Sequence, residues 1–342
     1  MRLGRTLIIG IAVVFAIGGL LWGAAALWVD GPARRWLAAL MAATFVLGGA
    51  TVLIAVRPWW RALVLTAGLV AAVALWWSRI SPRNDRDWMP DGARLPSATI
   101  DGDRVTIRNL RDFDYRSETD FTERWETRTY DLSQLRGADM FFSFWGPTFI
   151  AHTIASWEFA DGQHLAISIE TRKENGETYS AVRGFFRQYE LYYVVADERD
   201  VIGVRTNHRG ERVYLYRVRL PIERSRAALV DYLAEVNRLA TEPRWYNALT
   251  HNCTTTIREH ARRVGPVQPW SWQILANGYL DRLWYDRGVL DTTLPFDELK
   301  ARSDITERAK RAAGAADFSA RIRAGLPNGS SPASPSTPAA HP

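Results

Sequence analysis

Three long apolar stretches near the N-terminus constrain the fold of this chain most strongly. Residues 6–29, 36–56 and 62–78 contain no Asp, Glu, Lys or Arg. Each is close to the roughly 20 residues that a helix needs to cross a bilayer, and tryptophans lie near their ends, as at membrane interfaces. The first stretch could instead be a signal peptide, but it is too long and two further stretches follow it directly. We therefore predict a membrane domain of three transmembrane helices in residues 1–80.

The arginines that flank these stretches do not decide the orientation of the helices. Arg2, Arg5, Arg57 and Arg61 lie on one side of the membrane, and a similar number lie on the other side, so the positive-inside rule is balanced. An odd number of spans still places the N-terminus and the rest of the chain on opposite sides.

The remaining chain divides by composition into three parts. Residues 81–95 are charged and contain proline, which predicts a juxtamembrane linker. Residues 96–325 are long enough for one domain with its own core, and residues 326–342 are rich in Pro, Ser and Ala, which predicts a disordered tail. The net charge of +6 is not arranged as basic runs with aromatic residues, so a nucleic-acid partner is not expected; a mild basic excess suits anionic lipid.

The order of predicted elements in the large domain favours an α+β fold. Residues 98–107 predict a hairpin, residues 178–204 further strands, and residues 213–218 another strand, because β-branched and aromatic residues dominate them. Residues 227–240 then predict a helix with an apolar stripe, and Ser225 is the candidate cap. Strands followed by helices are typical of α+β domains rather than of a parallel doubly wound sheet.

A second hairpin, in residues 152–171, brings a histidine and a carboxylate together. Its three-residue loop ends in Gly162, a common hairpin closure. The register that keeps polar and apolar residues on separate faces places His152 opposite Glu170, roughly 5 Å apart at Cβ. A neutral imidazole held by a carboxylate can act as a general base toward a thiol.

Cys253 is the single cysteine of the chain. It has no partner for an intrachain disulfide, and it follows a polar segment that predicts the start of a helix. A thiol at a helix N-terminus meets unpaired N–H groups that favour the thiolate. A lone cysteine is otherwise a small apolar filler, and the pairing with His152 favours the nucleophile.

Three segments together, residues 151–172, 187–200 and 246–255, resemble the Lnb-type domain, the N-terminal periplasmic domain family of bacterial lipoprotein N-acyltransferases. That family is similar to a permuted papain-like cysteine enzyme, in which the histidine precedes the cysteine. His152 and Cys253 keep this order. The resemblance therefore implies a permuted papain-like domain, with an antiparallel sheet plus helices, on the outer side of a bacterial inner membrane.

The resemblance also implies a chemistry: a thiolate attacks a lipid ester, becomes a thioester, and passes the acyl group to the α-amino group of a lipoprotein. Cys253 is then the nucleophile and His152 the base, with Glu170 as orienting group from the hairpin register. Membrane lipid and a lipoprotein are the expected partners. The layout differs from that of the lipoprotein enzymes, because the spans precede the domain and no apolar stretch follows Cys253.

Further residues near the motifs are candidates for supporting roles. Asn252 is expected to cap the helix or support an oxyanion, and Tyr246 to pack or donate to that oxyanion. His251 is a rival base, although adjacent residues at a helix start point apart. The candidates on the substrate side are Ser156, Glu158, Arg172 and His251.

Two other functions stay open at this point. The domain could be a cysteine peptidase or amidase that acts on cell-wall peptides, or a membrane-anchored binding module without catalysis. No motif predicts a cofactor. His152, His164 and His251 have no ligand spacing typical of zinc, so a metal site is not expected. The cluster at residues 197–200 is expected to be a turn with salt bridges rather than a site for a headgroup.

Overall fold

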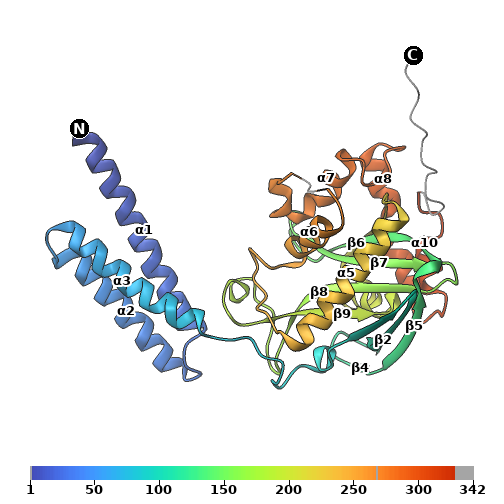
Figure 1. Cartoon of the computed structure of the whole chain (residues 1–342), viewed down its shortest axis with the longest axis horizontal. Helices are drawn as coiled ribbons and strands as arrows, with labels where there is room; N and C mark the ends of the chain where they lie inside the picture. Colours follow the sequence, from blue (N-terminus) through green and yellow to red (C-terminus); the bar gives the residue numbers. More distant parts are fainter. Residues whose placement is uncertain (1, 267–268, 328–342) are drawn as a thin grey trace, which may run out of the picture. The chain divides into compact units, whose positions relative to one another are not determined.

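The computed structural model describes residues 2–266 and 269–327. The chain forms two compact units (Figure 1). The first contains the N-terminal helices as far as Arg83 together with Thr178–Glu190, and the second contains Asn84–Glu177 and the chain from Leu191 onward. The predicted tail falls almost entirely on residues 328–342, which lie outside the described part.

The N-terminal unit consists of the helices α1 (Arg2–Val29), α2 (Arg35–Ala55) and α3 (Trp59–Ser78). All three are long and apolar enough to cross a membrane. They expose large apolar side chains such as Phe15, Leu47 and Ile54, which is the surface that lipid requires rather than water. The prediction of three long apolar helices is confirmed.

Thr178–Glu190 belongs to the same unit because it packs on these helices. Phe186 joins an apolar cluster with Ala26, Leu27 and Val73, and the Gln188 amide donates to the Asp30 carboxylate over 2.7 Å. The segment contains only the short 3₁₀ helix η3 (Arg183–Phe185). The prediction of strands through residues 178–204 is therefore wrong for this part, where Phe186 packs on helices instead of entering a sheet.

The second unit is built on one large sheet, in the order β1-β2-β9-β8-β7-β6-β10, with β5 paired to β2. The pairs β1–β2, β2–β5, β6–β7, β7–β8 and β6–β10 are antiparallel, and β2 makes a short parallel contact with β9. The strands are β1 (Ser97–Asp101), β2 (Arg104–Arg111), β5 (Trp125–Asp131), β6 (Leu135–Phe144), β7 (His152–Phe159), β8 (His164–Arg172), β9 (Glu190–Ala196) and β10 (Arg212–Val218). A separate short ribbon is formed by β3 (Asp114–Tyr115) and β4 (Phe121–Thr122).

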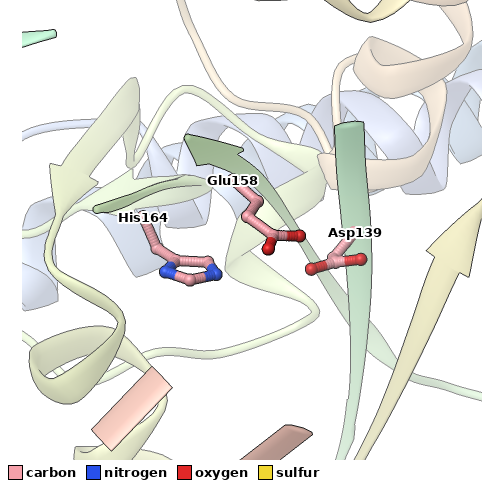
Figure 2. A group of neighbouring side chains, drawn as sticks. All are labelled: Asp139, Glu158 and His164. Carbon is pink, nitrogen blue, oxygen red and sulfur yellow. The ribbon is translucent and has the colours of Figure 1, made fainter. Parts of the chain in front are cut away.

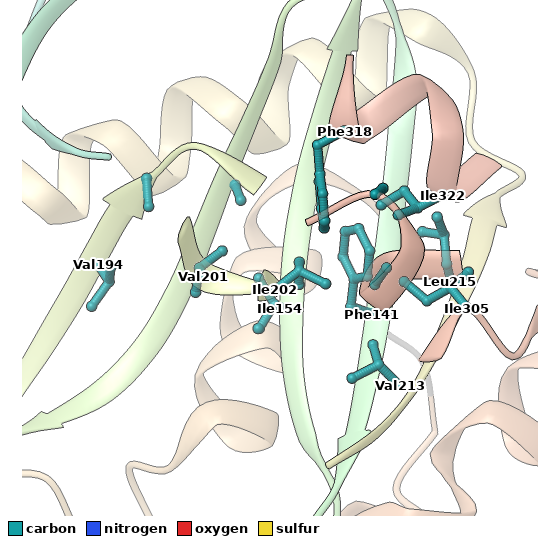
Figure 3. Close-up of a cluster of buried hydrophobic side chains, with 14 of the residues drawn as sticks. Phe141, Ile154, Val194, Val201, Ile202, Val213, Leu215, Ile305, Phe318 and Ile322 are labelled. Carbon is teal, nitrogen blue, oxygen red and sulfur yellow. The ribbon is translucent and has the colours of Figure 1, made fainter. Parts of the chain in front are cut away.

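Helices cover both faces of this sheet. On one face lie α5 (Ile222–Thr241), which crosses the strands in Figure 1, and α6 (Cys253–Val264). On the other face lie α4 (Glu198–Val201), α9 (Thr306–Arg311) and α10 (Phe318–Arg323). There Phe141, Ile154, Ile202 and Phe318 form a buried cluster (Figure 3). Short helices complete the unit: η1 (Pro90–Gly92), η2 (Leu132–Gln134), η4 (Val204–His208), η5 (Trp272–Ile274), η6 (Asn277–Tyr279), α7 (Leu280–Asp286) and α8 (Phe296–Ser303).

The α+β prediction is confirmed, and so are the first hairpin, β10 and the amphipathic helix. The stripe residues of α5, from Leu229 to Leu239, are buried. The prediction of Ser225 as the helix cap is wrong. Helix α5 begins at Ile222, three residues before Ser225. Pro221 is the cap residue, and its carbonyl accepts from the N–H of Ser225. Ser225 is therefore a buried residue of the first turn.

Candidate active site

The central hairpin has the predicted register. Ile154 lies opposite Ser168 and Glu158 opposite His164, and Gly162 closes the loop with a φ of 85°. The prediction assumed that one face of the hairpin is buried, whereas both faces are almost fully covered. Helices on both sides of the sheet explain this difference. The register thus fixes where His152, the first residue of β7, lies in a packed core.

The imidazole of His152 is held by two groups from β8. Its Nε2 lies 2.7 Å from the Ser168 hydroxyl and 3.0 Å from Oε1 of Glu170. Ser168 in turn donates to the same carboxylate over 2.7 Å. The predicted meeting of His152 and Glu170 is confirmed, and the ring orientation is set by a carboxylate together with a hydroxyl.

Arg205 also contacts the Glu170 carboxylate, at the same oxygen as His152. The guanidinium of this buried arginine donates to Glu170 over 2.6 Å and to Glu211 over 3.0 Å. Glu170 therefore contacts His152 and also pairs with an arginine. The sequence motifs did not indicate Arg205, which lies in the π-helix η4, just after the residues where strands were expected.

Cys253 is the first residue of α6, as predicted. Asn252 is the helix cap: its Oδ1 accepts from the Thr255 N–H over 2.9 Å, and Thr255 Oγ1 accepts from the Asn252 N–H over 2.9 Å. The Asn252 amide also donates to the Ala248 carbonyl over 2.7 Å. The side chain of Asn252 therefore serves the helix start and positions Cys253.

The thiol and the imidazole meet at the end of β7. His152 lies close enough to Cys253 to lower the pKa of the thiol, and the neighbouring Thr153 lowers this pKa as well. The imidazole of His152 therefore neighbours the thiol of Cys253 and contacts the carboxylate of Glu170.

These contacts shift the pKa values of both partners. Burial opposes the charged imidazolium, but the Glu170 carboxylate outweighs it and raises the pKa of His152 to about 9. Burial likewise disfavours the thiolate, but the hydrogen bond and charge of His152 outweigh it and lower the pKa of Cys253 to about 7. The pKa of Glu170 lies well below its usual range: burial would raise it, but His152 and Arg205 dominate. Between the two values the pair is a thiolate beside an imidazolium, the reactive form of a cysteine nucleophile.

We expect the alkylation rate of Cys253 by iodoacetamide to rise through about pH 7, because the thiolate forms as pH rises through the lowered pKa. At pH 7 about half of the thiol would be ionised, against about 1% for an ordinary pKa near 9, so the rate should be roughly fiftyfold higher than for an unperturbed thiol. Stopped-time alkylation followed by mass spectrometry measures this profile.

The matched variants for this experiment are Glu170→Gln and Glu158→Gln, two carboxylates of the same hairpin. Loss of Glu170 should lower the pKa of His152 and move the alkylation profile to higher pH, whereas Glu158→Gln should leave the profile in place. A wild-type rate that rises only near pH 9 would contradict the thiolate–imidazolium pair.

Asn277 holds the two halves of the site together and was not found from the sequence. Its amide accepts from the Ala151 N–H over 2.8 Å and donates to the Ala151 carbonyl over 2.6 Å. It also donates to Thr254 Oγ1 over 2.7 Å. Asn277 therefore links the residue before His152 to the residue after Cys253. Asn277 lies after the recognised motifs, and no local sequence pattern distinguishes it from the other asparagines of the chain.

The remaining candidates contact other parts of the structure. Tyr246 is buried before the cap. Ser156 donates to Glu198 and Glu158 pairs with Arg217. Arg172 donates to the carbonyls of Gly92 and Ala93, and the exposed His251 contacts Thr250 through Nδ1. None of these contacts involves Cys253 or His152.

The acidic cluster at residues 197–200 is paired with arginines, as expected, but within α4 rather than in a turn. Asp197 contacts Arg128 over 2.5 Å and Asp200 contacts Arg111 over 2.7 Å. These contacts stabilise the fold away from Cys253.

One group of side chains could in principle hold a metal ion. Asp139, Glu158 and His164 bring one ligand atom each to within 4.8 Å of one another (Figure 2). However, Arg217 contacts both carboxylates, and Arg323 donates to Asp139 over 2.7 Å. Two guanidinium groups already neutralise this cluster, so a cation would compete with them for the same oxygens.

Comparison with protein-family models finds a match over the part of the chain that contains these residues. Residues 121–278 match the model of the Lnb N-terminal periplasmic domain. Over these residues the chain is similar to the Lnb-type domain, in agreement with the resemblance of its sequence motifs. The matched segment runs from β4 to η6 and contains His152, Glu170, Cys253 and Asn277. No curated protein and no solved structure is significantly similar to the chain.

The family and the helices together describe the protein at a coarse level. An Lnb-type domain is periplasmic by the description of its family, and three apolar helices precede it. The chain is thus a membrane protein with a periplasmic domain.

Proposed function

We propose that this protein is a multi-pass inner-membrane thiol acyltransferase, which moves a fatty acyl group from a lipid or lipoprotein ester through a thioester on Cys253. The proximity of Cys253 to His152, whose imidazole also contacts Glu170, carries the proposal. The resemblance to the N-terminal domain of lipoprotein N-acyltransferases supports the choice of a lipid ester. The same geometry supports the permuted papain-like relationship.

The first half of the reaction forms the thioester. The Cys253 thiolate attacks the ester carbonyl and gives a tetrahedral oxyanion, which the N–H groups at the start of α6 stabilise. The bond between carbon and the alkoxy oxygen then breaks. The leaving alcohol takes its proton from the His152 imidazolium.

The second half returns the enzyme to its starting state. An amine attacks the thioester carbonyl and His152, now neutral, accepts the proton of the amine. The carbon–sulfur bond breaks and the thiolate forms again beside the imidazolium. Glu170 and Ser168 keep the ring in place throughout, because both contact its Nε2.

Mass spectrometry of the purified full-length protein tests this function. After incubation with a diacyl phospholipid or a diacylated lipopeptide, we expect a fatty acyl group on Cys253, at up to one acyl group per protein. The adduct should be released by hydroxylamine, which cleaves thioesters.

A parallel incubation with a murein peptide separates acyl transfer from peptidase or amidase chemistry. The proposal expects no cleavage of that peptide. Cleavage without any acyl adduct would replace the proposed function with hydrolysis of cell-wall peptides. A thiol that neither acylates nor alkylates would indicate a binding module.

A further inference from the structure

Large apolar side chains are exposed around Cys253 rather than spread over the domain. We call six of them the apolar rim: Phe149, Ile150, Leu249, Trp270, Trp272 and Leu275. Each is between 38% and 63% exposed. In the described part of the second unit, Ile100 is the one large exposed apolar residue that lies away from the segments bearing the rim.

The contacts of the site bring the segments of the rim together. Asn277, two residues after Leu275, bonds to Ala151, the neighbour of Ile150, and to Thr254. The Gly278 N–H donates to the Phe149 carbonyl over 3.0 Å. A Cβ at Gly278 would lie 2.1 Å from the Thr148 carbonyl oxygen, so only glycine allows this approach. Leu249 lies in the turn that the pairing of Asn247 with His251 closes, directly before Cys253.

The same segments contain no charged residue. Residues 145–151, 246–250 and 269–279 lack Asp, Glu, Lys and Arg, although 23% of the chain is charged. A site for a charged, water-soluble peptide would need opposite charges at its entrance, and these segments offer none. Exposed tryptophan and aliphatic side chains without charge are typical of surfaces that enter the interface of a bilayer.

We propose that the apolar rim is a membrane-binding surface that inserts into the outer part of the bilayer and opens Cys253 to lipid. The bilayer is the partner within reach, because α3 ends at Ser78 and the second unit begins at Asn84. The inference rests on the proposed function for its use: a lipid ester would enter the site without leaving the membrane. The rim therefore indicates that the substrates of the site are lipid esters that reside in the membrane.

Spin labels on the full-length protein in lipid nanodiscs test the insertion. Cys253 is the single cysteine of the chain, so Cys253→Ser permits one label at Trp270→Cys or Leu275→Cys, with Ile100→Cys as matched control. In nanodiscs of phosphatidylethanolamine and phosphatidylglycerol, rim labels should relax with oxygen dissolved in lipid and not with a water-soluble nickel chelate. The label at position 100 should show the reverse. Rim labels as accessible to nickel as that control would overturn the inference.

A second arm measures turnover with Cys253 intact. Leu275→Asp or Trp270→Asp should lower turnover of a diacyl phospholipid roughly tenfold or more, because burial of one large apolar side chain is lost. Alkylation by iodoacetamide should stay unchanged, which shows an intact thiol and imidazole, and Ile100→Asp should change neither. Full lipid turnover in both rim variants would also overturn the inference.

The two proposals fail in different ways. The labelling experiment requires no catalysis. Inserted labels without an acyl adduct would therefore contradict the proposed acyltransferase activity and support the membrane-binding role of the rim. An acyl adduct on Cys253 with water-exposed labels would contradict the membrane-binding role of the rim and support the proposed acyltransferase activity.

Discussion

Cys253→Ser is expected to abolish the acyl adduct and to lower turnover of a lipid ester by at least about a thousandfold. The sulfur is reactive because its lowered pKa, about 7, makes a thiolate beside an imidazolium. A serine hydroxyl does not ionise in that range. His152, with a pKa of about 9, is already protonated at neutral pH and cannot take the hydroxyl proton. Turnover with a diacyl phospholipid and mass spectrometry of the protein measure the loss.

The thermal unfolding midpoint separates lost chemistry from lost structure in this variant. Serine differs from cysteine by one atom, and the capping contacts between Asn252 and Thr255 do not involve the sulfur, so the midpoint should change by only a few degrees. Wild-type turnover in a well-folded Cys253→Ser protein would end the case for covalent catalysis.

His152→Ala is expected to lower turnover by roughly a hundredfold to ten-thousandfold, since it removes both proton transfers. Alkylation of Cys253 near pH 7 should slow as well, because the pKa of the thiol loses the group that depresses it. The same two assays, turnover and alkylation, measure both effects.

His251→Ala is the matched control for this variant. His251 is nearer to Cys253 in sequence, but it is exposed and contacts Thr250, so its loss should change turnover less than about twofold. A larger loss in His251→Ala than in His152→Ala would reassign the base.

The parts of the fold that could be predicted from sequence have strong periodic signals. The three apolar helices and the stripe of α5 repeat over many turns, and the hairpin of β7 and β8 has a turn residue at a fixed place. The start of α5 and the course of Thr178–Glu190 could not be predicted in this way. In Thr178–Glu190 a local pattern was overruled by contacts with distant residues, since Phe186 packs on Ala26 and Val73. The start of α5 was missed for a local reason, because Pro221 and not Ser225 is the cap residue.

The residues of the site likewise fall into those that a local pattern predicts and those that only the tertiary fold brings together. His152 and Glu170 are linked by one hairpin, so register alone brings them together, and Cys253 is indicated by the helix start. Arg205 and Asn277 reach the site only through the tertiary fold: Asn277 bonds to Ala151, 126 positions away. No local pattern in one sequence carries that information, and these residues emerge only from the structure.

The position of Cys253 also bears on the lifetime of an acyl intermediate. The residue is only 7% exposed, since α6 begins within the core rather than above it. A thioester on this sulfur would meet few water molecules, so hydrolysis would be slow and the acylated protein would persist until an acceptor arrived. The first alcohol would then be released as a stoichiometric burst, and the acceptor concentration would set the pace of every later cycle.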